Sequence, residues 1–435
     1  MYGRIRRENS VLSDGTMFGR RRRGVQLWHL GLTLLIILIA AGAIWQFNTI
    51  QPKVLALVGS QATPTPNAVT HAQLADQAYL QGDLTTAILN YRAAAQQDPT
   101  NVDILYELVR VLIYHSYGDV RFSSDIDEAV KWGTQIVTAN PNNDRANAIY
   151  CYALVRKSQD EDAVRACIRA ISINDNNGDA HAFLSMAYYD LQRYNAALDE
   201  GQKAVSLDPN SIDGHGAYAY ALNFQGKNSQ ALDEFKQATK INPRLEFPYF
   251  NLGAFARNLG IKGDDGMFLV AITAYDAVLK INAGSVKAYT RLCETYLAKN
   301  NQDSDRLDAR DYCKKAIALD DGYALAWRWL GEVQHRSRNY EDAIDSLAKC
   351  VDLEKDLPPD ERDAICWWLQ AADQFILGYC DKAQPLLEDV LTWTTDSTAI
   401  RETRTVINKC ATAYQGQYKT PVPIPTPTLK PTPIL

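Results

Sequence analysis

Residues 178–211, GDAHAFLSMAYYDLQRYNAALDEGQKAVSLDPNS, and residues 212–244, IDGHGAYAYALNFQGKNSQALDEFKQATKINPR, place the same residue types 34 positions apart. In each segment, two runs of about 13 residues carry apolar side chains at three- and four-residue spacing, which is the helical period. Each segment therefore predicts a helix hairpin. The matched positions are His181, Leu184, Tyr188, Ala197, Ala204 and Pro209, followed by His215, Tyr218, Leu222, Ala231, Ala238 and Pro243.

Small residues occupy the positions where two helix backbones must approach closely, and Asp-Pro or Asn-Pro ends each second helix. With its 34-residue period, the segment resembles the tetratricopeptide repeat. The resemblance implies an all-α fold, a right-handed superhelical solenoid in which each unit stacks on its neighbours. The small positions are Ser185, Ala197, Ala204, Ala219, Ala231 and Ala238.

Aligning the small residue of each second helix extends the resemblance over about residues 68 to 415. It predicts nine units in residues 68–396 and a capping helix at 397–415, which would cover the exposed end of the stack. Extra residues are expected between the helices of a unit at 117–124, 259–268 and 299–306, and between units at 354–362. The aligned residues are Ala87, Ala129, Ala163, Ala197, Ala231, Ala271, Ala309, Ala343 and Ala383. Gly133 and Gly201 stand where the family usually has a bulky residue.

The N-terminus predicts one membrane crossing. Residues 25–45 carry no formal charge and would span roughly 31 Å as a helix, which matches a hydrocarbon core of about 30 Å. We assign residues 25–47 to a transmembrane signal anchor. The seven Arg in residues 1–24 predict a basic cytoplasmic tail and send the repeats to the extracytoplasmic side. The alternative is a signal peptide cleaved near Ala43, after which the body is secreted.

Two Pro/Thr-rich stretches flank the repeats. Residues 48–67 are expected to be a linker and residues 416–435 a disordered tail, because such sequences cannot bury enough apolar surface to fold alone. Both are expected to be extended. The tail is either a solvated end or a segment that threads a cell wall or docks on a partner.

Composition excludes several function classes. The formal charge is −6, and the chain outside the first 24 residues carries −11, which argues against binding to nucleic acid. The sequence contains no phosphate-binding Gly loop, no HExxH and no GxSxG motif, so no enzyme activity, catalytic residue, cofactor or metal is expected. His71, His181 and His215 stand at the first consensus position of a repeat, where a packing role is expected.

The repeat register sorts the eight cysteines into four local pairs. Two pairs link the helices of one unit, one links units eight and nine, and one links the last unit to the cap. An even count in an exported protein favours disulfides, whereas small buried thiols are the alternative. The expected pairs are Cys151 with Cys167, Cys293 with Cys313, Cys350 with Cys366, and Cys380 with Cys410.

Resemblance to the family places positions two, five, six, nine, twelve and thirteen of each first helix along a concave groove. Exposed aromatic side chains there would suit an extended or helical peptide; the alternative is packing against neighbouring helices. The groove candidates are Phe183, Met186, Tyr189, Tyr220, Phe224, Phe247 and Phe250.

A second candidate site is a partial version of the clamp with which some family members grip a C-terminal carboxylate. Asn251, Lys287 and Arg291 match three of its five positions, but Gly216 and Tyr220 stand where Lys and Asn belong. Arg328 would extend the positive charge. The alternative is that these side chains are solvated and paired with acids such as Glu294 and Glu332.

Two functions from different classes follow. The first is a membrane-anchored, extracytoplasmic scaffold that binds a protein or peptide client or assembles an envelope complex. The second is a structural surface-layer or sheath protein whose own copies associate. An accessory subunit of an enzyme cannot be separated from the scaffold by sequence.

Overall fold

The computed structural model describes residues 67–118, 124–300 and 302–413. The chain divides into two units, Met1–Pro66 and Asn67–Leu435. The predicted basic tail (1–24), transmembrane helix (25–47) and Pro/Thr tail (416–435) lie outside the described residues, as does the linker (48–67) except Asn67. Among the described helices, none is both long and apolar enough to cross a bilayer.

The described residues form nine helix hairpins and one further helix. The first five hairpins are α2 (Ala68–Gln81) with α3 (Leu84–Gln97), α4 (Val102–Ser116) with α5 (Ser124–Ala139), α6 (Asp144–Arg156) with α7 (Asp160–Ile173), α8 (Gly178–Asp190) with α9 (Tyr194–Leu207), and α10 (Ile212–Phe224) with α11 (Asn228–Ile241). The remaining hairpins are α12 (Glu246–Ile261) with α13 (Gly266–Ile281), α14 (Val286–Lys299) with α15 (Asp303–Leu319), α16 (Ala324–Arg336) with α17 (Tyr340–Glu354), and α18 (Ala364–Ile376) with α19 (Cys380–Trp393). The further helix is α20 (Ser397–Ala413), and a 3-10 turn, Pro359–Glu361, separates α17 from α18.

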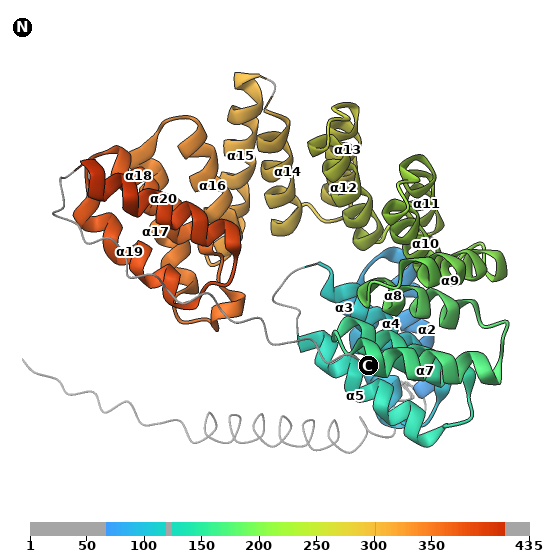
Figure 1. Cartoon of the computed structure of the whole chain (residues 1–435). Helices are drawn as coiled ribbons and strands as arrows, with labels where there is room; N and C mark the ends of the chain where they lie inside the picture. The colour runs from blue at the N-terminus through green and yellow to red at the C-terminus, as the bar shows by residue number, and fades with distance from the viewer. Residues whose placement is uncertain (1–66, 119–123, 301, 414–435) are drawn as a thin grey trace, which may run out of the picture. The chain divides into compact units, whose positions relative to one another are not determined.

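Each hairpin packs on the next one along the chain (Figure 1). Helix α8, for example, contacts its partner α9 and the first helices α6 and α10 of the neighbouring units. No strand occurs in the ranges that the structure describes. The prediction of an all-α solenoid built from helix hairpins is therefore confirmed.

The first helices begin at residues that cap them. Asn143, Asn177 and Ser211 stand 34 residues apart, and the side-chain oxygen of each accepts a hydrogen bond from the backbone N–H three residues on. Such a cap satisfies one of the N–H groups that have no partner within the helix, a contribution of about 1 kcal/mol. The repeat thus fixes where each unit starts.

The turn inside a unit requires a left-handed residue. Gly226 has φ +72°, and Gln192 and Ser158, 34 and 68 residues earlier, have φ 60°. Glycine adopts this conformation without steric cost, whereas the side chains of Gln192 and Ser158 do not favour it. The left-handed turn between the two helices of a unit is therefore present even where the residue is not glycine.

The first consensus position holds each unit to the loop before it. The Nε2 atoms of His181 and His215 lie 3.1 and 2.9 Å from the carbonyl oxygens of Asp175 and Pro209, six residues earlier. Trp327 Nε1 donates to the equivalent carbonyl, that of Asp321, at 2.8 Å. Both histidines therefore have a structural role.

The second ring nitrogen of these histidines also has a partner. His215 Nδ1 lies 2.5 Å from Glu234 Oε2, and His181 Nδ1 contacts Glu200. Because carbonyl and carboxylate oxygens only accept, both nitrogens of His215 donate, as in an imidazolium. Burial alone would lower the pKa of His215, but the hydrogen bonds to Glu234 and Pro209 outweigh it and raise the pKa.

The glycines that depart from the family pattern have a steric explanation. A Cβ on Gly201 would lie 2.9 Å from Tyr218 Cα, and one on Gly133 would lie 3.1 Å from Tyr150 Cδ2. In both places a second helix approaches the next first helix too closely for a larger side chain. The bulky residue that is usual at this position would push the two units apart.

One insertion differs from the expected loop. The extra residues at 259–268 lengthen α12 and α13 to 16 residues each, rather than forming a long connection. Leu259 and Phe268 are buried, and a Cβ on Gly260 would lie 2.9 Å from the Phe268 ring. Burial of these side chains stabilises the added helical turns.

The structure joins the eight cysteines in the four expected pairs. The Cα atoms lie 5.4 Å apart in Cys151–Cys167, 5.3 Å in Cys293–Cys313, 5.9 Å in Cys350–Cys366 and 5.8 Å in Cys380–Cys410. These separations are normal for disulfides. The first two bonds link the helices of one unit, the third links α17 to α18, and the fourth links α19 to α20.

Reduction of the full-length protein should therefore add eight hydrogen atoms to its intact mass. Peptide mapping without reductant should recover the four linked pairs and no others. Replacing Cys151 and Cys167 together by Ala should lower the free energy of unfolding by about 3 kcal/mol, because the closed loop no longer restricts the unfolded chain. Free thiols at any of the eight positions in protein purified from its own cells would contradict this prediction.

Candidate functional site

The first helices of units three to six are α6, α8, α10 and α12, and the face that they form is called the first-helix face. Unit two, which consists of α4 and α5, partly covers this face. Tyr114, on α4, donates from its hydroxyl to Asp213 Oδ2 on α10 at 2.5 Å. The Tyr114 ring also stacks on Phe247 of α12, with the ring centroids 4.2 Å apart. Repeats in a solenoid normally contact only their neighbours. These contacts instead join units that lie about 100 residues apart in the chain, since Tyr114 and Asp213 are separated by 99 positions.

Asp213 is the centre of this contact. Its Oδ1 accepts a second hydrogen bond, 2.9 Å long, from the hydroxyl of Tyr152 on α6. Burial raises the pKa of the Asp213 carboxyl to about 6, although the two tyrosine hydroxyls oppose that shift. Three first helices, α4, α6 and α10, therefore meet at one buried carboxyl group.

The same arrangement occurs one unit earlier. Tyr106, two helical turns before Tyr114 on α4, donates to Asp179 on α8. Asp179 and Asp213 are 34 residues apart and occupy position two of consecutive units. Helix α4 thus runs along a row of equivalent acids.

The structure corrects the expectation that the groove aromatics face solvent. Phe183, Phe247 and Phe250 are buried. Of these, Phe247 stacks on Tyr114 of unit two, whereas Phe183 stacks on Tyr152 of the adjacent unit three, with ring centroids 4.2 Å apart in both pairs. The Phe250 ring centroid lies 6.2 Å from that of Tyr275 in its own unit. Phe224 alone among the seven candidates is exposed. The packing alternative holds for the three buried rings.

The three remaining groove candidates and the clamp candidate Asn251 line one pocket of about 210 Å³. Met186, Tyr189, Tyr220 and Asn251 are all half-buried. The Tyr220 hydroxyl donates to Asn251 Oδ1 at 3.2 Å, so the Asn251 amide group keeps its two N–H donors for another partner. The pocket is also lined by Tyr117, Arg156, Asp190, Asp213, Gly216 and Phe247.

Arg156 contributes the positive charge of this pocket. Its guanidinium carbon lies 4.2 Å from the centroid of the Tyr117 ring, and its buried Nε has no hydrogen-bond partner among the residues that the structure describes. Among the described residues, no carboxylate forms an ion pair with it; Asp190 acts on it only through its charge at longer range. The pocket thus contains a cation that forms no ion pair with a described residue and whose Nε donor is unused there.

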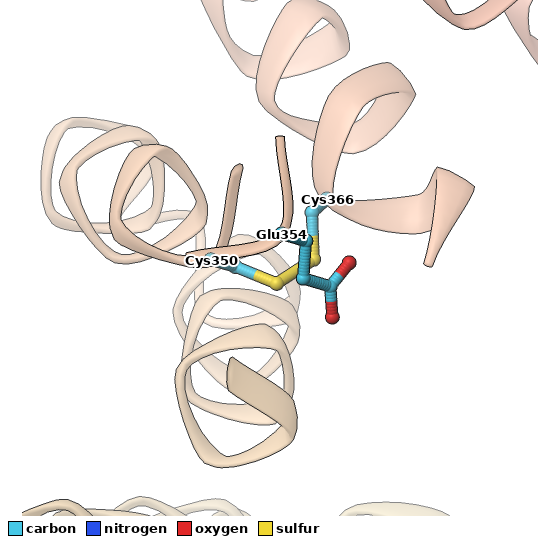
Figure 2. A group of neighbouring side chains, drawn as sticks. All are labelled: Cys350, Glu354 and Cys366. Carbon is cyan, nitrogen blue, oxygen red and sulfur yellow. A yellow bond between two sulfur atoms is a disulfide. The ribbon is translucent and has the colours of Figure 1, made fainter. Parts of the chain in front are cut away.

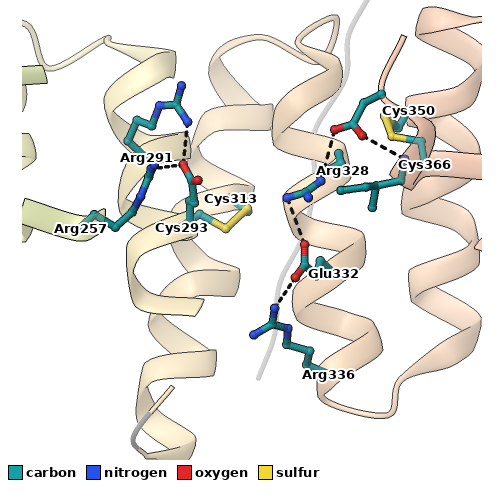
Figure 3. A network of polar contacts seen from close by, with 12 residues as sticks. Arg257, Arg291, Cys293, Cys313, Arg328, Glu332, Arg336, Cys350 and Cys366 are labelled. Carbon is teal, nitrogen blue, oxygen red and sulfur yellow. Dashed lines mark hydrogen bonds and ion pairs between the residues drawn. A yellow bond between two sulfur atoms is a disulfide. The ribbon is translucent and has the colours of Figure 1, made fainter. Parts of the chain in front are cut away.

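The predicted clamp residues Lys287 and Arg291 have partners within the chain. Lys287 Nζ donates to the Tyr117 carbonyl and lies 4.7 Å from the Phe250 ring centroid. Arg291 pairs with Glu294 at 2.7 Å, and Arg257 of α12 pairs with the same carboxylate (Figure 3). Asn251 is the one clamp residue that lines the pocket.

Arg328 is buried rather than exposed on the groove. Its guanidinium lies 3.7 Å from the Trp329 ring centroid and pairs with Glu332 at 3.0 Å and with Asp363 at 3.4 Å. Glu332 also pairs with Arg336, as Figure 3 shows. Arg328 therefore holds α16 against the start of α18, and the structure gives it a packing and pairing role.

A possible metal-ligand group lies beside this network. A carboxylate oxygen of Glu354 lies within 4.8 Å of the sulfur atoms of Cys350 and Cys366, whose disulfide is drawn in Figure 2, and burial raises the pKa of Glu354 to about 7. A thiolate, not a disulfide sulfur, is the usual metal ligand. With the disulfide formed, Glu354 is left as a single carboxyl ligand, so this group is not a candidate metal centre.

Sequence reasoning missed Arg156 and Tyr117. Arg156 is at position thirteen of unit three, a groove position by the rule applied to units four to six, so extending that rule by one unit would have identified it. Tyr117 gave no such signal, because it follows the end of α4 and reaches the pocket only through the contact between units two and six.

Sequence comparison identifies tetratricopeptide repeats in two parts of the chain. Models of this repeat match residues 178–211 and residues 302–356. No curated protein sequence matches the chain.

Three solved structures are similar in part. YrrB, described as a tetratricopeptide protein with an unusual peptide-binding site, is 20% identical, with 45% of this chain and 95% of YrrB covered and a TM-score of 0.32. The Cut9–Hcn1 hetero-tetramer of the APC/C is 16% identical over 78% of this chain and 68% of that chain, with a TM-score of 0.47. The C-terminal part of a repeat protein from Cytophaga hutchinsonii is 15% identical over 59% and 98%, with a TM-score of 0.42. At this similarity none of them says what this chain binds.

The buried carboxyl group generates a prediction for pH dependence. The pKa of Asp213, about 6, lies above that of an unfolded Asp, about 3.9, so protonation favours the folded state. The stabilisation of the folded state by protonated Asp213 is fully present below about pH 4 and is lost as the pH rises through about 6. Asp213→Asn removes the titration, so between pH 4 and 7 the wild type should lose roughly 2–3 kcal/mol of unfolding free energy that the variant keeps.

Urea unfolding at several pH values measures this difference. Asp199→Asn, at an exposed position of α9, is the matched control and should follow the wild type. Parallel pH profiles for the wild type and Asp213→Asn would show that Asp213 titrates normally in the folded protein.

Proposed function

We propose that this chain, in which residues 178–211 and 302–356 are tetratricopeptide repeats, is a scaffold that binds a protein or peptide client through the first-helix face of units three to six. Stacked repeats of this type present extended binding surfaces rather than catalytic sites. The proposed role is therefore binding or assembly, without catalysis and without a cofactor.

The pocket beside Tyr220 is the observation that supports this role. It combines half-buried aromatic walls with a small number of converging polar groups, a composition typical of binding sites. Tyr189, Tyr220 and Asn251 were predicted as binding residues from their repeat positions alone. Their position around one pocket favours a client that reaches between units four and six.

The proposed location is the outer side of a membrane. Residues 25–47 have the length and apolar character of an anchor, and the Arg-rich residues 1–24 favour a cytoplasmic N-terminus. Four disulfides suit an oxidising compartment. Cleavage near Ala43 would release the body into the same compartment.

Filling the pocket should release the client. A Cβ on Gly216 meets no atom within 4 Å, so Gly216→Leu can enter the pocket without displacing the backbone. Crosslinking and capture from membranes with the full-length variant should recover at least tenfold less client than with the wild type.

Gly266→Leu is the matched control for this capture, because Gly266 is also a helix residue with room for a side chain but lies outside the pocket. Equal client recovery with both variants would move the binding site elsewhere. If the captured protein is the chain itself, and the purified protein sediments as large assemblies, the surface-layer function replaces the scaffold.

The topology has a separate test. Protease added to intact cells, or to spheroplasts where an outer membrane covers the surface, should degrade the repeats and spare residues 1–24. Protection of the repeats under conditions that expose the outer face would place the body in the cytoplasm and contradict the proposed location.

A further inference from the structure

Most arginines on the first-helix face of this array are neutralised by neighbours. Arg257 and Arg291 share Glu294, and Arg328 lies between Glu332 and Asp363. Arg156 differs, because within the described part of the chain its guanidinium has a ring contact and no ion pair. A half-buried cation without a counter-ion has lost part of its hydration and has not regained it from the protein.

The surroundings of Arg156 favour an anion as the missing partner. The two oxygens of Asp213, the buried carboxyl group in the pocket wall, already accept from Tyr114 and Tyr152. Asp190 is exposed and forms no ion pair with Arg156. Neither acid therefore meets the hydrogen-bonding capacity of the guanidinium.

A second donor lies in the same pocket. Asn251 accepts the Tyr220 hydroxyl through Oδ1, which orients its N–H groups away from that contact. An amide N–H and a guanidinium are both donors, and a guanidinium can hold the two oxygens of a carboxylate at once. The donors of Arg156 and Asn251 that lack a partner among the described residues are thus matched to a carboxylate.

The apolar walls and the volume limit what accompanies that carboxylate. Met186, Tyr189 and Phe235 line the pocket. About 210 Å³ is less than the ~300 Å³ at the lower end of pockets for drug-sized ligands. There is room for one residue of a client rather than for a longer segment.

From these contacts we infer that the pocket receives a single carboxylate-bearing residue of a client peptide, with its carboxylate on Arg156 and Asn251 and its apolar part against Met186 and Tyr189. This inference rests on the proposed scaffold function and names the chemistry that its pocket selects. It assigns the selectivity to Arg156 of unit three, not to Lys287 and Arg291.

Three fluorescein-labelled peptides of one sequence test the inference with the full-length protein in detergent. The first ends in Leu with a free carboxylate, the second ends in Leu amide, and the third ends in Glu amide. Fluorescence anisotropy should show that the first or the third peptide binds at least tenfold more tightly than the Leu amide. The stronger of the two identifies the source as a chain terminus or an acidic side chain.

Variants connect the preference to the pocket. Arg156→Met should abolish the difference in affinity between the carboxylate peptide and the Leu amide. Asn251→Asp still accepts from Tyr220 but adds a negative charge, so it should weaken binding of the carboxylate peptide at least fivefold. Arg165→Met is the matched control, because Arg165 is an exposed arginine of the same unit outside the pocket, and it should bind as the wild type. Circular dichroism spectra and melting temperatures identify any variant that fails to fold.

Equal binding of all three peptides, or discrimination that survives both pocket variants, would overturn the inference, as would absence of binding by any peptide. Tighter binding of a control peptide ending in Lys amide would assign the pocket to Asp190 and a cation instead. The client capture with Gly216→Leu is independent of these probes. A client that is lost in that variant and retained by Arg156→Met would leave the scaffold function standing and remove only the carboxylate selectivity.

Discussion

The contact of Tyr114 and Tyr152 with Asp213 determines how the first half of the array is arranged. A carboxylate without partners in a protein interior is costly, and here two tyrosine hydroxyls meet that requirement. The two tyrosines come from units two and three, whereas the acid belongs to unit five. The equivalent hydrogen bond from Tyr106 to Asp179 shows that α4 contacts two successive units, four and five. Tyr106 and Tyr114 lie two turns apart on α4. Each finds an acid because an Asp stands at position two of both units four and five, as Asp179 and Asp213.

This arrangement changes the surface that the first helices present. The face that the first helices would share with a ligand is occupied, between units four and six, by side chains of unit two. Phe247 is covered by Tyr114, and the Tyr117 carbonyl receives Lys287. What is left is a small pocket in place of an open groove. This pocket contains the guanidinium of Arg156, which forms no ion pair with a described residue.

Local contacts hold the individual units, and they follow the repeat closely. The capping residues at 143, 177 and 211 and the carbonyl contacts of His181 and His215 recur at 34-residue spacing. The disulfides act at the same scale, since each joins helices that are adjacent in the chain. The contacts that hold each unit therefore lie within that unit or between neighbours.

The sequence by itself determined the parts of this protein that depend on neighbouring residues. Helical periodicity and small residues predicted the hairpins and the solenoid, and the repeat register predicted which cysteines face one another, because each of these contacts lies within about one unit of the chain. Tertiary structure alone decided which groove residues are covered. The burial of Phe247, the pairing of Lys287 and the presence of Tyr117 in the pocket all arise where unit two meets units five to seven, across 99 to 170 residues. Such a contact depends on small rotations between successive units that add up along the array, and no local pattern of residues encodes their sum.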